Sequence, residues 1–215
     1  MIYWLSGPRG ADQFRRWARA LWRVLLGACL LYAFLVRPWM RTWGATAAEC
    51  EAALPGDDFV PGASTQATRA ITLGSPPEAV WPWLVQIGTR RAGWYSYACL
   101  DNGCHPSAEA ILPEFQGLKQ GDKVPISPDG KASFPVALLL KERLLGLGGD
   151  DGKVGALWAM VLQPLPEGRC RLIVRLRMRV RPWYVGLPAQ LLLEPVHFIM
   201  ERKMLLELER RTEKI

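Results

Sequence analysis

The chain has 215 residues, of which half are apolar, 22% are charged and ten are tryptophan. This composition excludes disordered and collagen-like proteins, because it supplies ample apolar surface for a buried core. The formal net charge is +7, but residues 1–41 alone hold seven arginines against one aspartate. The rest of the chain is close to neutral, whereas a nucleic-acid-binding domain carries its basic patch in the folded body. We therefore predict no nucleic-acid partner.

Residues 21–40 (LWRVLLGACLLYAFLVRPWM) form an apolar run near the N-terminus. Twenty residues at about 1.5 Å each give about 30 Å of helix, which matches the hydrocarbon core of a bilayer. Arg23 and Arg37 lie near the two ends, where their side chains can extend toward headgroups. Pro38 is expected to end the helix. We predict that residues 1–43 are a basic N-terminus with a single transmembrane helix, so that the membrane is one partner.

A cleaved signal peptide and a soluble or surface-lying helix are the alternatives for this segment. The A-x-A sequence at 45–47 lies further past the apolar run than cleavage sites usually do. Five arginines lie at or before residue 23, two follow at 37 and 41, and the next charged residues are acidic. By the positive-inside rule, this single-pass protein of the cell membrane would have its N-terminus in the cytoplasm and its domain outside.

The segment at 44–66 is rich in Gly, Ala, Pro and Asp and is expected to be a tether. A domain follows at 67–215. Its first elements are a strand at 66–73, a short helix at 76–86 with a double proline in its first turn, an aromatic loop at 88–102 and a second short helix at 107–112. Four strands are then predicted, at 123–127, 132–141, 154–163 and 169–181, with turns at 129–130, 148–152 and 164–168.

The strand at 169–181 has the clearest pattern in the chain, since arginines at odd positions alternate with apolar residues at even ones. This period of two predicts one solvated arginine face and one dry face. Attraction of the arginines to anionic lipid headgroups is a sharper alternative. The last predicted element is a helix at 194–215 with an apolar stripe of Val196, Ile199, Met200, Met204 and Leu208.

This order of elements predicts an α+β fold in which a curved antiparallel sheet wraps round a long C-terminal helix, in addition to the N-terminal transmembrane helix. Such an arrangement leaves an apolar cavity between sheet and helix, and cavities of this kind are default ligand sites.

Five stretches resemble the SRPBCC superfamily, the START-like helix-grip group that includes polyketide cyclase/dehydrase-like and lipid-transfer proteins. They are ATRAITLGSPPEAVWPWLVQIG (67–88), GWYSY (93–97), HPSAEAILPEFQ (105–116), the strand at 158–164 and EPVHFIMERKMLL (194–206). The resemblance runs from about residue 43 to residue 213. It implies a helix-grip fold with an apolar cavity, in a group whose members range from carriers to enzymes. After the Tyr-Ser-Tyr, relatives often continue with an acidic residue and an aromatic one, where this chain has Ala98 and Cys99.

Six residues are candidate cavity contacts. Trp94 and Tyr97 suit a cavity mouth because their rings can pack on a ligand while the polar end stays wet, although they could simply anchor the loop to the core. His105 could contact the ligand or cap a helix. His197 and Glu201 are four apart and face the same way, so they form either an acid/base pair or a local hydrogen bond. Met200 is expected on the cavity side of the last helix.

Cys99, Cys104 and His105 superficially resemble metal ligands, but a structural zinc site needs a second pair at defined spacing. We predict no metal and no cofactor. If the domain lies outside the cell, a disulfide between the two cysteines is possible.

The leading functional hypothesis is a membrane-anchored domain that binds, and possibly transports, a lipid or other small hydrophobic ligand. The alternatives are a cyclase/dehydratase-type enzyme that uses Tyr97, His197 or Glu201 as acid or base, and an interaction module whose cavity is filled by its own side chains.

Overall fold

The computed structural model describes residues 8–213, except for the side chains of residues 8–12 and of five positions between 183 and 190. Residues 1–7 of the predicted basic N-terminus and the last two residues of the predicted C-terminal helix lie outside this range. The chain divides into two compact units, residues 1–40 and 41–215. Each unit is described by itself.

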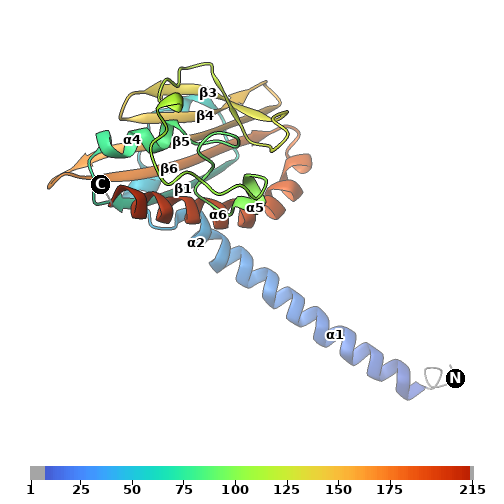
Figure 1. The fold of residues 1–215 in the computed structure, drawn as a ribbon. Coiled ribbons are helices and arrows are strands. Elements are labelled where there is room, and N and C mark those ends of the chain that lie inside the picture. The colour runs from blue at the N-terminus through green and yellow to red at the C-terminus, as the bar shows by residue number, and fades with distance from the viewer. Residues whose placement is uncertain (1–7, 214–215) are drawn as a thin grey trace. The chain divides into compact units, whose positions relative to one another are not determined.

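The N-terminal helix is continuous through α1 (Pro8–Leu31), the π-helical turn η1 (Tyr32–Val36) and α2 (Arg37–Thr42), and Figure 1 labels α1 and α2. The stretch Gln13–Thr42 is 30 residues long and apolar enough to cross a membrane by length and composition. Signal sequences share both properties, so the helix itself does not establish a membrane anchor.

The expectation that Pro38 ends this helix is wrong. Proline lacks an N–H and crowds the carbonyl four residues earlier, which normally breaks or kinks a helix. Here the wider π-turn lies directly before it, closed by a hydrogen bond from the Arg37 N–H to the Tyr32 carbonyl. A π-turn is one of the recognised ways in which a helix absorbs such a local irregularity.

The second unit is built on one six-stranded antiparallel sheet in the order β1-β6-β5-β4-β3-β2. The strands are β1 (Thr65–Leu73), β2 (Lys123–Pro125), β3 (Ser133–Leu140), β4 (Leu144–Asp150), β5 (Val154–Leu165) and β6 (Arg169–Val180). The long helix α6 (Trp183–Thr212) packs against β1 and β6, and α4 (Pro77–Val85) packs against α6 and β5 (Figure 1). The predicted α+β fold, a curved antiparallel sheet on a long C-terminal helix, is confirmed.

Strand β4 is missing from the sequence prediction, which placed a turn at 148–152. The strand contains three glycines, which disfavour strands in general. Gly148 is required here by a close approach of the backbone, because a Cβ atom at that position would lie 2.0 Å from the Ala156 carbonyl oxygen of β5. The glycine is therefore part of the β4–β5 pairing.

The predicted helix at 107–112 is also wrong. This segment has no regular secondary structure, and one buried side chain, Gln86 at the end of α4, bonds to its backbone groups. Gln86 donates to the Ala110 carbonyl at 3.2 Å and accepts from the Leu112 N–H at 2.9 Å. The Ala108 N–H donates to the Ala92 carbonyl, which adds a further bond across the loop.

Helix α6 begins eleven residues before the predicted start at Glu194, and it contains two prolines. Its buried face also differs from the predicted stripe, since Val196 and Ile199 are 47% and 50% exposed. The residues buried on α6 between 191 and 213 include Phe198, Glu201, Met204, Leu205 and Leu208. Met204 and Leu208 are buried as the stripe predicted, but further toward the N-terminus the buried positions are Phe198 and Glu201, and Glu201 is buried as an ion pair that a purely apolar stripe could not include.

The predicted solvated arginine face of β6 is covered in part by residues 44–63, which lie within the tether predicted at 44–66. This segment contains the helical turns α3 (Ala47–Glu51) and η2 (Asp57–Phe59) and buries Leu54 and Val60. Arg175 is 2% exposed beneath it, so the description of the whole face as solvated is wrong.

Arg175 and Arg171 are covered because the covering segment supplies them with hydrogen-bond acceptors. Arg175 donates to the Asp57 carboxylate at 2.7 Å and to the Glu49 and Ala52 carbonyls at 2.6 and 2.8 Å. Arg171 donates to both carboxylate oxygens of Glu49, at 2.7 and 2.9 Å. A segment with little regular structure leaves carbonyl groups unpaired, and a guanidinium with five donors can satisfy several at once.

Candidate functional site

A cavity of about 420 Å³ lies in the second unit between the inner face of the sheet, α6 and the aromatic loop. Its volume falls in the range of small-molecule sites, roughly 300–1,000 Å³. Eleven of its fifteen lining residues are apolar: Trp94, Ile126, Phe134, Leu147, Val154, Ala156, Trp158, Leu176, Met178, Met200 and Met204. The four polar ones are Ser96, Asp101, His197 and Glu201.

The aromatic loop is held by hydrogen bonds from its buried rings. The Trp94 Nε1–H donates to Thr89 Oγ1 at 2.9 Å, and the Trp94 ring lies 5.7 Å from that of Trp158 in β5. The Tyr95 hydroxyl donates to the Trp83 carbonyl at 3.1 Å and is buried, which raises the pKa of Tyr95 above its ordinary value. These contacts fix Trp94 as one wall of the cavity.

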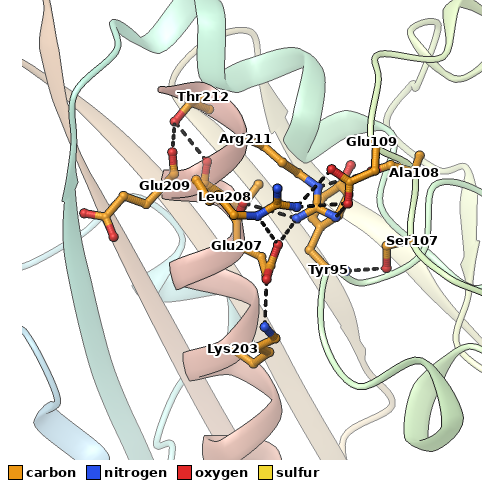
Figure 2. Close-up of polar contacts among 11 residues, drawn as sticks. Tyr95, Ser107, Ala108, Glu109, Lys203, Glu207, Leu208, Glu209, Arg211 and Thr212 are labelled. Atoms are coloured by element: carbon orange, nitrogen blue, oxygen red, sulfur yellow. Dashed lines mark hydrogen bonds and ion pairs between the residues drawn. The ribbon is translucent and has the colours of Figure 1, made fainter. Parts of the chain in front are cut away.

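The C-terminal half of α6 is tied to the same loop region by a cluster of charged residues (Figure 2). Arg211, which is buried, donates to Glu109 at 2.7 Å and to the Ala108 carbonyl at 3.1 Å, and its guanidinium lies 4.9 Å from the centre of the Tyr95 ring. Glu207 accepts from Lys203 at 2.7 Å and also pairs with Arg211. Although burial raises the pKa of Glu207, hydrogen bonds from Lys203, Arg210 and Arg211 outweigh this and lower it to about 2. The cluster therefore anchors the helix and loop that together enclose the cavity.

A buried ion pair stands on the helix side of the cavity. The Arg69 guanidinium of β1 lies 2.9 Å from Oε2 of Glu201, and both side chains are 2% exposed. Nδ1 of His197 lies 3.3 Å from the same oxygen. Burial lowers the pKa of His197, while Glu201 acts in the opposite direction, so the neutral imidazole is favoured near neutral pH. In that state Nδ1–H can donate to Glu201 and Nε2 is left as an acceptor.

Ser96 and Asp101 are cavity residues that the sequence analysis missed. Burial raises the pKa of Asp101, and the neighbouring Ser96 hydroxyl offsets part of that increase. Within residues 8–213, neither carboxylate oxygen of Asp101 and neither the Ser96 hydroxyl nor Oε1 of Glu201 has a hydrogen-bond partner of standard geometry. These atoms are themselves covered by neighbouring side chains, so the surface that faces the cavity is almost entirely apolar.

The six candidate residues divide into two groups. Trp94, His197, Met200 and Glu201 lie on the cavity wall. Tyr97 and His105 do not line it: Tyr97 is 45% exposed, and His105 is exposed in a turn where its backbone bonds to Asn102. Asp101 lies in the predicted aromatic loop, and the signal that could have found it is a carboxylate between two closely spaced cysteines.

The cysteines next to this loop are bonded to each other. Cys99 and Cys104 form a disulfide, which closes the short helix α5 (Ala98–Asp101) and the turn after it. In the part of the chain that the structure describes, no group of three or more His, Cys, Asp or Glu side chains is arranged to hold a metal ion.

Comparison with protein-family models and with curated proteins finds no match. Among solved structures, the chain is similar to the hypothetical protein jhp0584 from Helicobacter pylori, at 14% identity and a TM-score of 0.44, over 75% of this chain and 96% of that one. It is also similar to the polyketide_cyc-like protein Cgl2372 from Corynebacterium glutamicum, at 17% identity and a TM-score of 0.37, over 72% and 94% of the two chains. The match to the protein of unknown function EF2215 from Enterococcus faecalis, at 12% identity and a TM-score of 0.37, covers 54% of this chain and only 57% of that one.

Proposed function

We propose that this protein binds a lipid or other small hydrophobic molecule in the cavity between the sheet and α6, as a single-pass membrane protein of SRPBCC type. The observation that carries the proposal is the cavity of about 420 Å³ whose accessible wall is almost entirely apolar. The side chains of an apolar cavity wall of this size can make van der Waals contacts with an apolar ligand. The cavity also argues against an interaction module whose interior is filled by its own side chains.

The membrane part of the proposal rests on the N-terminal helix. Its length and composition suit a span, and its excess of arginines lies before the apolar run. A disulfide between Cys99 and Cys104 fits the expected location of the domain outside the cytoplasm, because disulfides persist in oxidising compartments.

The catalytic alternative has less support from the geometry. Glu201 is held by Arg69, and Tyr97 does not line the cavity. Asp101 has a raised pKa, but both of its carboxylate oxygens are covered by neighbouring side chains. An acid or base must come within hydrogen-bond reach of the reacting group. Of the candidates, His197 alone lines the cavity with a ring nitrogen that can exchange a proton, so the arrangement favours binding over acid/base catalysis by a pair of residues.

The test is native mass spectrometry of the full chain purified in detergent. The wild-type protein should retain a bound small molecule, or should take up a fatty acid or a polycyclic probe after delipidation. Met200→Trp, which fills space in the cavity, should reduce the bound fraction. Ile199→Trp is the matched control. The Ile199 side chain is exposed and does not line the cavity, so this substitution should leave binding unchanged. Absence of any bound or added apolar ligand on the wild type would refute the proposal.

A further inference from the structure

The two halves of α6 differ sharply in composition. Residues 183–200 contain a single charged side chain, Glu194, whereas residues 201–213 contain eight. A helix on a protein surface ordinarily presents charged or polar side chains to solvent. The first half presents apolar ones instead: Leu192, Leu193, Val196 and Ile199 are between 47% and 74% exposed.

Further exposed apolar side chains gather at the same cavity. Tyr97 and Leu100 are 45% and 66% exposed, and each is adjacent in the chain to a lining residue, Ser96 and Asp101 respectively. Val154, at the start of β5, is 48% exposed and lines the cavity itself. On α6, the exposed Val196 and Ile199 flank the lining residues His197 and Met200 in the same way.

Three elements therefore contribute both to the cavity wall and to the exposed apolar surface beside it: the loop around α5, the start of β5 and the first half of α6. We define the apolar rim as Tyr97, Leu100, Val154, Leu192, Leu193, Val196 and Ile199. Within the described part of the second unit, Leu140, Tyr184 and Leu191 are the remaining large apolar side chains that are exposed to this degree. Contiguous apolar patches at a protein surface mark sites of interaction with another protein, a ligand or a membrane.

Contacts of the residues at and just after the end of the N-terminal helix favour a membrane as the partner of the apolar rim. Arg41, in the last turn of the long apolar N-terminal helix, forms an ion pair with Glu194, the single charged residue in the apolar half of α6. Two residues later, the Trp43 ring lies 5.1 Å from the guanidinium of Arg202 on the same helix. The end of the proposed membrane anchor and the apolar rim are thus joined through α6. If the anchor spans a bilayer, its end lies at the bilayer surface.

We propose that the apolar rim docks on the lipid bilayer that holds the N-terminal helix, with Leu192, Val196 and Ile199 as its central contacts. Spaced at i, i+4 and i+7, these three side chains share one face of α6. Apolar side chains of an interfacial helix reach about 5–10 Å into the boundary between headgroups and acyl chains. Docking would open the cavity mouth toward the acyl chains, so that a lipid could enter through the rim. This entry route rests on the proposed function. The docking itself requires only the anchor.

The test places a fluorophore on the full chain in liposomes. Cys29 and Cys50 are replaced by serine, which leaves the buried Cys170 and the disulfide in place. Bimane is attached through Ile199→Cys or, as a matched control, through Lys141→Cys at the exposed turn between β3 and β4. Lipids that carry a spin label near the headgroup end of the acyl chain should quench bimane at position 199, with a blue shift of its emission, and should leave position 141 unquenched.

Equal quenching at the two positions would overturn the proposal. A blue shift at position 199 without lipid quenching, lost on dilution to about one protein per vesicle, would assign the rim to a second copy of the chain and also overturn it. Met200→Trp should reduce ligand binding and leave the quenching unchanged, so failure of the ligand proposal is distinguishable from failure of docking. Flotation of the labelled protein with the liposomes separately tests the anchor.

Discussion

The two faces of the sheet are both covered, but by different means. The inner face packs on α4 and α6, with one deeply buried ion pair between Arg69 and Glu201. The outer face is covered over β6 by a segment with little regular structure, which lies on a row of arginines. The backbone N–H and C=O groups of a helix bond to one another, so a helix can pack against apolar side chains. The carbonyl groups of an irregular segment instead need hydrogen-bond donors from elsewhere. The comparison shows that an arginine row on a strand can be a docking surface for the same chain.

The largest expected effect is on the inner face. Arg69→Met would leave Glu201 buried without its ionic partner, and breaking such a pair costs about 3–5 kcal/mol. The free energy of unfolding of the detergent-solubilised full chain, from chemical denaturation, measures this loss. The double variant Arg69→Met with Glu201→Leu should recover most of it, since the uncompensated charge is then gone. A single-variant loss below about 1 kcal/mol would contradict a desolvated pair.

A smaller effect is expected when the outer face loses its central donor. Arg175→Met removes the partner of Asp57 and of several carbonyls, and each buried group left unsatisfied costs about 1–3 kcal/mol. Asp57 keeps 18% of its side chain exposed, so part of this cost is offset by water. We expect a total loss of about 2–3 kcal/mol.

Arg175→Met should also loosen the covering segment. A protease that cuts after glutamate should cleave at Glu49 or Glu51 faster in this variant than in the wild type. Unchanged cleavage together with unchanged stability would show that Arg175 does not hold the segment.

The outer face should also respond to pH through Glu49. Hydrogen bonds from Arg171 are the main cause that lowers the pKa of Glu49 to about 2 in the folded protein. A carboxylate with a depressed folded-state pKa stabilises the fold above its unfolded pKa of about 4.3, and this contribution disappears as the pH falls toward 2. We expect a contribution of about 1–3 kcal/mol that is present at pH 6 and lost progressively below pH 5.

The melting temperature measured between pH 6 and pH 2.5 tests this expectation. Glu49→Gln should have the lower melting temperature at pH 6, and the difference from the wild type should shrink as the solution is acidified. A difference that does not change with pH would mean that the carboxylate's charge contributes nothing.

Local patterns predicted most of the fold and half of the cavity's polar residues. The alternation in β6 identified its two faces, and the spacing of His197, Met200 and Glu201 placed them near one another on the last helix. What the sequence could not indicate were contacts between distant positions. Arg69 and Glu201 are 132 residues apart, and no local pattern pairs a strand arginine with a helix glutamate. The outer face was misjudged for the same reason, since its covering segment lies more than 100 residues before β6.

The smallest expected effect distinguishes arginines within the same row. Arg169 has the same parity as Arg171 and Arg175, but its side chain is 45% exposed and its ionic partner, Glu167 in the adjoining turn, is 80% exposed. Exposed pairs contribute about 0–1 kcal/mol because water solvates both charges and salt screens them. Arg169→Met should therefore change the free energy of unfolding by no more than about 0.5 kcal/mol and leave cleavage at Glu49 as it is in the wild type. A loss as large as that of Arg175→Met would mean that the row acts through its summed charge rather than through hydrogen bonds to the covering segment, and added salt would then reduce both losses together.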